Sequence, residues 1–219
     1  MQKVEEILNQ SFQTAKKMKR LLYLVVLIYF ISYMIGYFMI TYNMPFALEM
    51  SESLLGDISE NPIFKPILEA IEDKNLPFAI IYTFTVNLLS GAFLTTTLPG
   101  VIPLLGAIIS ITVSAFRGFM IGALFTYAAS LNSEVSAEFG WALLSLGTMI
   151  LELGAYVFSA AAGINISLST IFPERYKVKS RWIAFKEAWK DTARIYVIVI
   201  VMLVLGAIWE MGGIFIFAP

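Results

Sequence analysis

Two stretches of this chain are almost free of charged side chains. From Asn75 to Ser133 the only charged residue in 59 is Arg117, and from Phe139 to Pro173 the only one in 35 is Glu152. About 20 apolar residues are enough to cross the hydrocarbon core of a bilayer. Both stretches are therefore predicted to lie within a membrane.

The composition extends this prediction to the whole chain. Of its 219 residues, 58% are hydrophobic and 14% are charged, whereas soluble domains have about 45–50% apolar and 25% charged residues. We therefore predict an all-α, polytopic transmembrane helical bundle. The chain has no cysteine and no histidine, which excludes disulfides, Cys/His metal sites and Ser–His catalysis.

Five spans are predicted, together with amphipathic interfacial helices. Residues 1–20 form an amphipathic N-terminal helix, because apolar side chains recur at helical spacing there. The remainder, 21–219, forms a single transmembrane domain. Its spans are predicted at about 21–42, 77–97, 104–129, 141–171 and 195–217.

Charge asymmetry predicts the orientation of these spans. Residues 1–20 carry a net charge of +3 and residues 174–194 a net charge of +4, whereas the loop 43–76 has seven carboxylates against two lysines. The short loop 130–140 is also acidic. Since lysine and arginine collect on cytoplasmic loops, the N-terminus is expected to be cytoplasmic and the C-terminus external.

Two segments leave alternatives open. The uncharged turn Pro99–Pro103 is expected to connect two helices, and a re-entrant piece near 99–103 is the alternative. The fourth apolar segment, from Trp141 to Phe172, is longer than a bilayer requires at 1.5 Å per residue. It is expected to be tilted, extended into water or broken near Gly163.

Arg117, Glu152 and Asn87 form the predicted intramembrane polar core. Counting from the outer ends of their segments at 1.5 Å per residue, Arg117 and Glu152 lie roughly 16–20 Å deep, and Asn87 lies at a similar depth. Segments three and four are antiparallel neighbours, so a direct or water-bridged ion pair is expected. Such a pair either fixes the register of two helices or marks an ion- or solute-binding site.

Small residues at a spacing of four predict close helix packing. Such residues allow helix backbones to approach each other in lipid. We expect them to hold segments two to four tightly together, with a homo-oligomer interface as the alternative. The predicted packing residues are Gly106, Ser110, Ser114, Gly118, Gly122, Ala155, Ser159 and Gly163.

The stretch from Arg181 to Arg194 combines aromatic and basic residues. Trp182, Phe185 and Trp189 share one helix face, with lysines beside them. This pattern is typical of an interfacial anchor in the lipid headgroups. A protein partner docking on this basic segment, or on the acidic external loop, is the alternative.

Several activities are not expected. The chain has no phosphate-binding glycine loop and no nucleophile–base pair, so we predict neither an enzyme nor a bound cofactor or metal. Its basic patches flank membrane spans, which argues against nucleic acid as a partner.

Four short motifs between Pro77 and Ser169 resemble the stage II sporulation protein M family. They are Val86-Asn87, Pro99-Gly100, Arg117-Gly118-Phe119-Met120-Ile121-Gly122, and Gly147-Thr148-Met149-Ile150-Leu151-Glu152 followed by Ala160-Ala161-Ala162-Gly163. The first Asn of each Asn motif of the family is replaced here, and its Pro-His-Gly turn is absent. The resemblance implies an integral membrane protein. Bacterial members act as membrane scaffolds that hold cell-wall hydrolases, and most relatives have no assigned activity.

Two functions are therefore predicted as alternatives. The first is a non-catalytic membrane scaffold or assembly subunit with a structural polar core. The second is a transporter or channel subunit in which Arg117, Glu152 and Asn87 bind an ion or a small solute.

Overall fold

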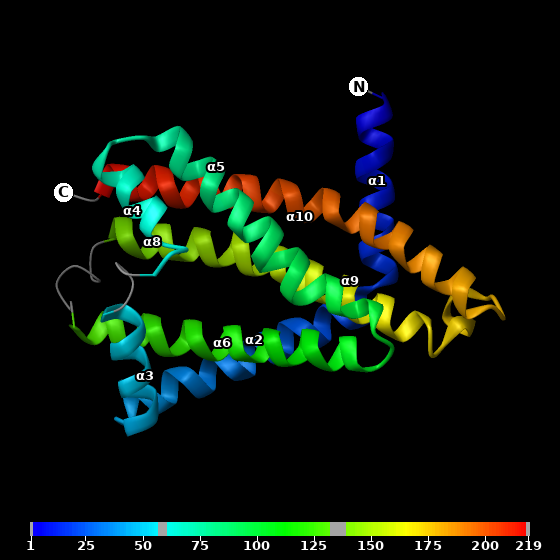
Figure 1. Ribbon diagram of the computed structural model, residues 1–219, viewed down its shortest axis with the longest axis horizontal. Coiled ribbons are helices and arrows are strands. Elements are labelled where there is room, and N and C mark those ends of the chain that lie inside the picture. The colour runs from blue at the N-terminus through cyan, green and yellow to red at the C-terminus, as the bar shows by residue number, and fades with distance from the viewer. Residues whose placement is uncertain (1, 57–60, 132–138, 218–219) are drawn as a thin grey trace.

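The computed structural model describes residues 2–56, 61–131 and 139–217, shown in Figure 1. In these ranges the chain forms helices and turns, and no strand. The elements are α1 (Gln2–Lys17), α2 (Lys19–Thr41), α3 (Pro45–Gly56), α4 (Lys65–Glu72), α5 (Leu76–Val86), η1 (Asn87–Thr97), η2 (Leu98–Val101), α6 (Leu105–Leu131), α8 (Phe139–Thr148), η3 (Met149–Leu153), α9 (Gly154–Ser169), η4 (Pro173–Tyr176) and α10 (Arg181–Phe217).

Five helices are long and apolar enough to cross a membrane, which confirms the predicted all-α polytopic bundle. These helices cover Lys19–Thr41, Leu76–Val101, Leu105–Leu131, Leu143–Ser169 and Arg181–Ile216. The segment near 99–103 connects two of them through the short 3₁₀ turn η2, after which α6 begins at Leu105. Among the described residues no sixth helix of this kind is present, so the connecting turn is favoured over the re-entrant piece.

The fourth span is not broken near Gly163. Gly163 lies in the middle of the continuous helix α9. The irregularity falls ten residues earlier, where η3 is a short π-helix between α8 and α9. Gly163 serves a different purpose, because a side chain there would collide with the backbone carbonyl of Thr96 in η1.

The basic stretch and the fifth span form one helix, so no break in the chain separates them at residue 195. α10 runs without interruption for 37 residues from Arg181. Nothing in the sequence stops it, because no proline lies between Arg181 and Phe217 and a proline is the residue that most reliably breaks a helix. The amphipathic stretch therefore continues straight into the span.

The acidic loop contains more helix than expected. It holds two helices, α3 and α4, which the five predicted spans do not include. The residues Asp57, Glu60, Glu134 and Glu138 of the two acidic loops lie outside the described residues.

Helix α9 is at the centre of the bundle. It contacts α2, α6, η1, η2 and α10, and twelve of its sixteen residues are buried, most of them small. The sequence analysis expected the small residues to hold segments two to four together, but the close packing also includes α2. α6 packs along α2, where Gly118 and Gly122 lie against the backbone of Tyr29 and Tyr33.

The predicted small-residue faces bring polar groups into contact as well as backbones. The Ser110 hydroxyl donates to the carbonyl of Thr96 at 2.6 Å, and the hydroxyls of Thr96 and Ser159 are 2.9 Å apart. The Thr97 hydroxyl donates to the carbonyl of Ser159 at 3.0 Å. Since lipid offers no hydrogen bonds, such contacts between helices stabilise the bundle.

Because Gly163 lies against the backbone of Thr96, adding one methyl group at position 163 is predicted to lower the stability of the protein. Gly163→Ala should lower the free energy of unfolding by about 1–3 kcal/mol, the usual cost of overpacking. Gly212→Ala is the matched control, because a side chain at Gly212 meets no other atom. Thermal unfolding in detergent compares the two variants, and equal transition temperatures would contradict this account of α9.

Candidate functional site

The three residues of the predicted polar core meet on one helix, η1. The side-chain amide of Asn87 donates to Oε1 of Glu152 at 2.7 Å. Nη2 of Arg117 donates to the carbonyl of Gly91 and to the hydroxyl of Thr95, both at 2.7 Å. The residues of η1 that make these contacts lie at a spacing of four: Asn87, Gly91 and Thr95. One face of η1 therefore forms hydrogen bonds with both Arg117 and Glu152.

Arg117 and Glu152 do not form the expected direct ion pair. The ion pairs within the described ranges are Lys17–Asp191, Lys190–Glu187 and Arg194–Asp191. Glu152 bonds to η1 at Asn87, whereas Arg117 bonds further along η1, at Gly91 and Thr95. The second span thus lies between the two charges and supplies neutral partners to each.

Aromatic rings complete the surroundings of Arg117. Its guanidinium lies 4.4 Å from the ring centroid of Tyr156, an arrangement that favours a cation. Gly91 gives that ring its space, since a side chain at this position would collide with Tyr156. Neither Tyr156 nor Gly91 was singled out as part of the polar core by sequence reasoning, because an isolated tyrosine in an apolar run carries no positional signal.

Glu210 is a further residue to which the sequence analysis assigned no role. The side chain of Glu152 packs against α10 at Gly206, and Glu210 lies one turn further along the same helix. The carboxyl groups of Glu152 and Glu210 are near enough to interact electrostatically. The polar core therefore extends onto the fifth span.

The helix geometry is unusual where Asn87 and Glu152 meet. Asn87 begins the eleven-residue π-helix η1, and Glu152 lies in the five-residue π-helix η3. π-helical turns are rare and often occur at functional sites. A sequence pattern based on 3.6 residues per turn could not predict them.

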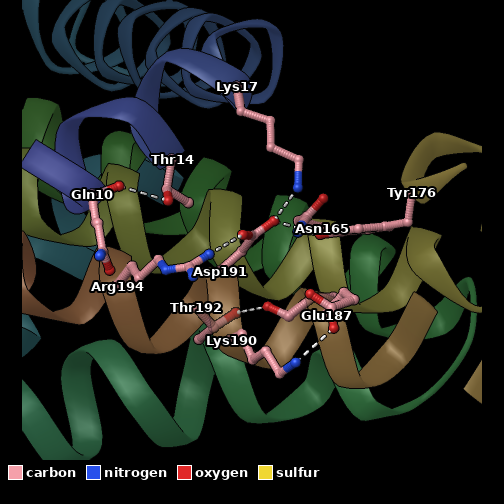
Figure 2. Close-up of polar contacts among 11 residues, drawn as sticks. Gln10, Thr14, Lys17, Asn165, Tyr176, Glu187, Lys190, Asp191, Thr192 and Arg194 are labelled. Atoms are coloured by element: carbon pink, nitrogen blue, oxygen red, sulfur yellow. Dashed lines mark hydrogen bonds and ion pairs between the residues drawn. The ribbon is translucent and has the colours of Figure 1, made fainter. Parts of the chain in front are cut away.

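A second polar cluster surrounds Asp191 at the basic end of the bundle, where α1, η4 and the start of α10 meet. Figure 2 shows the side chains of Lys17, Tyr176 and Arg194 directed toward the Asp191 carboxylate. Lys17 is 2.5 Å from Oδ2, the Tyr176 hydroxyl donates to Oδ2 at 2.9 Å, and Arg194 is 3.3 Å from Oδ1. This carboxylate ties α1 to α10.

Tyr176 links the cluster to the end of α9. Asn165 donates to its hydroxyl at 2.6 Å, and Lys17 lies 4.1 Å above its ring. Burial raises the pKa of Tyr176 above its ordinary value, the hydrogen bond from Asn165 opposes this, and the nearby Asp191 charge adds to the increase. The phenol therefore remains a hydrogen-bond donor to Asp191 at neutral pH.

The aromatic face predicted on the basic stretch is present. The rings of Trp182 and Phe185 stack with centroids 5.6 Å apart, and Trp189 meets Phe185 edge-on at 6.3 Å. Nζ of Lys186 lies 5.0 Å from the Trp182 ring. Trp182 itself is 61% exposed.

The described part of the chain holds no group of three or more Asp or Glu side chains positioned to share a metal ion. The intramembrane polar groups form hydrogen bonds between helices. The fold and these sites together define a polytopic, all-helical integral membrane protein with a hydrogen-bonded core.

The chain belongs to the stage II sporulation protein M family, whose family model matches residues 25–211. The match includes the polar core, most of α10 and Asp191 with Tyr176 and Arg194, but not Lys17. No curated protein and no solved structure matches the chain.

The hydrogen bond from Asn87 to Glu152 predicts energetic coupling between these two residues. In a double-mutant cycle of Asn87→Leu and Glu152→Leu, the two losses of stability should be non-additive by roughly 0.6–1.7 kcal/mol, the range measured between membrane helices. Exchanging the charges, Arg117→Glu with Glu152→Arg, should not restore stability, because the two side chains have separate partners. Restoration by the exchange, with additive effects in the cycle, would show that the direct ion pair forms instead.

The Asp191 carboxylate is predicted to control how firmly α1 is held. Asp191→Asn removes the charge that binds Lys17 and Arg194, and a hydrogen bond to a charged group contributes about 1.5–3 kcal/mol. Deuterium exchange of α1 amides should become roughly tenfold faster or more. Glu187→Gln, which removes the exposed ion pair with Lys190 one turn away, should leave the exchange of α1 unchanged; equal acceleration in both variants would contradict the assignment.

Proposed function

We propose that this protein is a non-catalytic membrane scaffold or assembly subunit whose basic end recruits a protein partner in the cytoplasm. The observation that carries the proposal is the length of α10. Its 37 residues extend about 55 Å at 1.5 Å per residue, whereas the hydrocarbon core is about 30 Å thick. Residues 195–217 alone are enough to cross it.

The first part of α10 therefore lies outside the hydrocarbon core. Trp182 is 13 residues before Ile195, which corresponds to roughly 20 Å, and the headgroup layer adds only about 5–7 Å on each side. The exposed face of Trp182, Phe185 and Lys186 thus extends beyond the depth of a lipid anchor. Exposed aromatic and cationic side chains are enriched in protein interfaces, and the net charge of +4 over residues 174–194 favours a partner with an acidic surface.

Helix α1 supports the same interpretation by stabilising this end. In Figure 1 it runs across the direction of the spans and crosses α10. Val4 and Phe12 are 62% and 57% exposed, as expected for a helix that lies in the membrane interface. The Asp191 cluster fixes α10 to this helix, so the projecting segment starts from a rigid base.

The polar core supports a structural role more than transport. Its hydrogen bonds connect helices to one another. The cavities beside α1, between α8 and α10, between α2 and α9, and beside η4 are lined by residues other than Arg117 and Glu152. Scaffolds are also what the family resemblance implies.

Single-cysteine variants test the proposal, because the natural chain has no cysteine. Ile183→Cys places a photoreactive maleimide beside the aromatic face, and Phe116→Cys places one on α6, where the side chain is 59% exposed. In native membranes the first should yield a protein adduct of defined mass, and the second should yield lipid adducts. Adding Trp182→Ala should reduce the protein adduct, and a membrane-impermeant maleimide should reach position 183 from the cytoplasmic side only.

Two outcomes would contradict the proposal. Lipid adducts alone at position 183 would show that the segment is a membrane anchor. Ion or solute flux in liposomes that disappears in Glu152→Gln would establish transport instead. Recruitment through the acidic loop and homo-oligomer formation stay predictions from the sequence.

A further inference from the structure

A polar cleft lies between α1 and α10 at the basic end of the bundle. Its volume is about 700 Å³, within the usual range of small-molecule sites. Every side chain that lines it is polar or charged, and none is aromatic. The charged groups are Glu5, Glu6 and Lys17 of α1 and Asp191 and Arg194 of α10. The lining therefore suits a charged group more than an apolar one.

One side of the cleft is cationic. Asp191 is only 4% exposed, and its carboxylate is bound by both Lys17 and Arg194. The two cations exceed this carboxylate by one charge, and their side chains remain 49% and 43% exposed. Arg194 contacts Asp191 through Nη1, which leaves further N–H groups of its five-donor guanidinium. Such donors match the oxygens of a phosphate.

The other side of the cleft is acidic. Glu6 accepts a hydrogen bond from the side-chain amide of Gln10 at 3.3 Å, and within the described ranges neither Glu5 nor Glu6 forms an ion pair. Figure 2 shows the Gln10 side chain beside that of Arg194, and both line the cleft. Glu6 is one helical turn from Gln10, about 5.4 Å along α1. Two unpaired carboxylates thus lie a short distance from two exposed cations.

The cleft lies at the edge of the hydrocarbon core. Arg194 directly precedes Ile195, where the predicted fifth span begins, and lipid headgroups occupy the layer just outside that core. α1 runs across the direction of the spans (Figure 1), and its apolar residues Val4, Ile7 and Phe12 are exposed. A helix of this kind lies in the membrane interface. Acyl chains can therefore contact its apolar face while a headgroup enters the cleft.

We propose that this cleft binds the headgroup of an aminophospholipid. The phosphate accepts hydrogen bonds from Arg194 and Lys17, and the primary ammonium donates to Glu5 and Glu6. A choline headgroup fits less well, because its quaternary ammonium has no N–H group and is typically held by aromatic rings, which this cleft lacks.

Other charged occupants leave one side of the cleft opposed. An anionic lipid would bring negative charge beside Glu5 and Glu6, and a basic peptide would bring positive charge beside Lys17 and Arg194. The inference is independent of the proposed scaffold role. At 100° per residue, Asp191 and Arg194 lie on the opposite side of α10 from its exposed aromatic face.

Native mass spectrometry of the whole protein tests the site. The protein is stripped of lipid in detergent and exposed to equimolar phosphatidylethanolamine, phosphatidylcholine and phosphatidylglycerol with identical acyl chains. The first lipid retained should be phosphatidylethanolamine, enriched about fivefold over each of the others, the gain expected for one exposed ion pair. In a separate arm, glycerophosphoethanolamine, which has no acyl chains, should not displace the bound lipid at an equal concentration.

Two variants examine the cleft itself. Glu5→Gln combined with Glu6→Gln should abolish the preference for the ethanolamine over the choline lipid, because both acceptors of the ammonium lose their charge. Glu174→Gln combined with Glu187→Gln, which removes two carboxylates outside the cleft, is the matched control and should keep the preference. Gln13→Trp fills the cleft from α1 without changing a charge and should reduce retention of the first lipid of every class.

Four outcomes would overturn the proposal. Equal retention of the ethanolamine and choline lipids, or a preference that survives the loss of both cleft glutamates, would show that the ammonium is not recognised. Preferred retention of phosphatidylglycerol would show that the cleft selects negative charge alone. Displacement by glycerophosphoethanolamine would make a soluble headgroup the occupant in place of a lipid.

Discussion

The arrangement of this bundle depends on one constraint: a polar group inside a membrane must find its partner within the protein. Helix η1 meets that constraint for both charged residues of the buried spans. Asn87 donates a hydrogen bond to Glu152, while Gly91 and Thr95 accept hydrogen bonds from Arg117. Both charged side chains are therefore hydrogen-bonded to neutral groups of the second span. The spans are therefore held at fixed positions relative to η1.

The fold was largely predictable because apolar length and charge asymmetry are strong signals in membrane proteins. The five spans, the small-residue faces of α6 and α9, and the aromatic face at Trp182 all follow from spacing. The exact ends of the helices could not be predicted in this way. The continuity of α10, for example, depends on the absence of a proline, which hydropathy does not measure. The packing of α6 along α2 was missed because Gly36, alone in its segment, forms no stripe.

The site was only half predictable for a physical reason. Depth counting predicted that Arg117, Glu152 and Asn87 lie at a similar level, because depth depends only on rise per residue. Which of them touch depends on rotation about the helix axis, and the π-turns of η1 and η3 change that rotation exactly where these residues lie. Tyr156, Glu210 and Asp191 contact the functional groups through tertiary structure alone, so no local pattern marks them.

The two sites differ in how completely their charges are balanced, and this difference separates their roles. Asp191 is almost fully buried, and two cations and a phenol surround its carboxylate. Its hydrogen-bonding capacity is therefore used within the protein, where it holds α1 against α10. Arg117 has two neutral acceptors, a ring and one free donor. A saturated cluster favours rigidity, whereas a buried donor left without an acceptor, such as Nη1 of Arg117, costs stability.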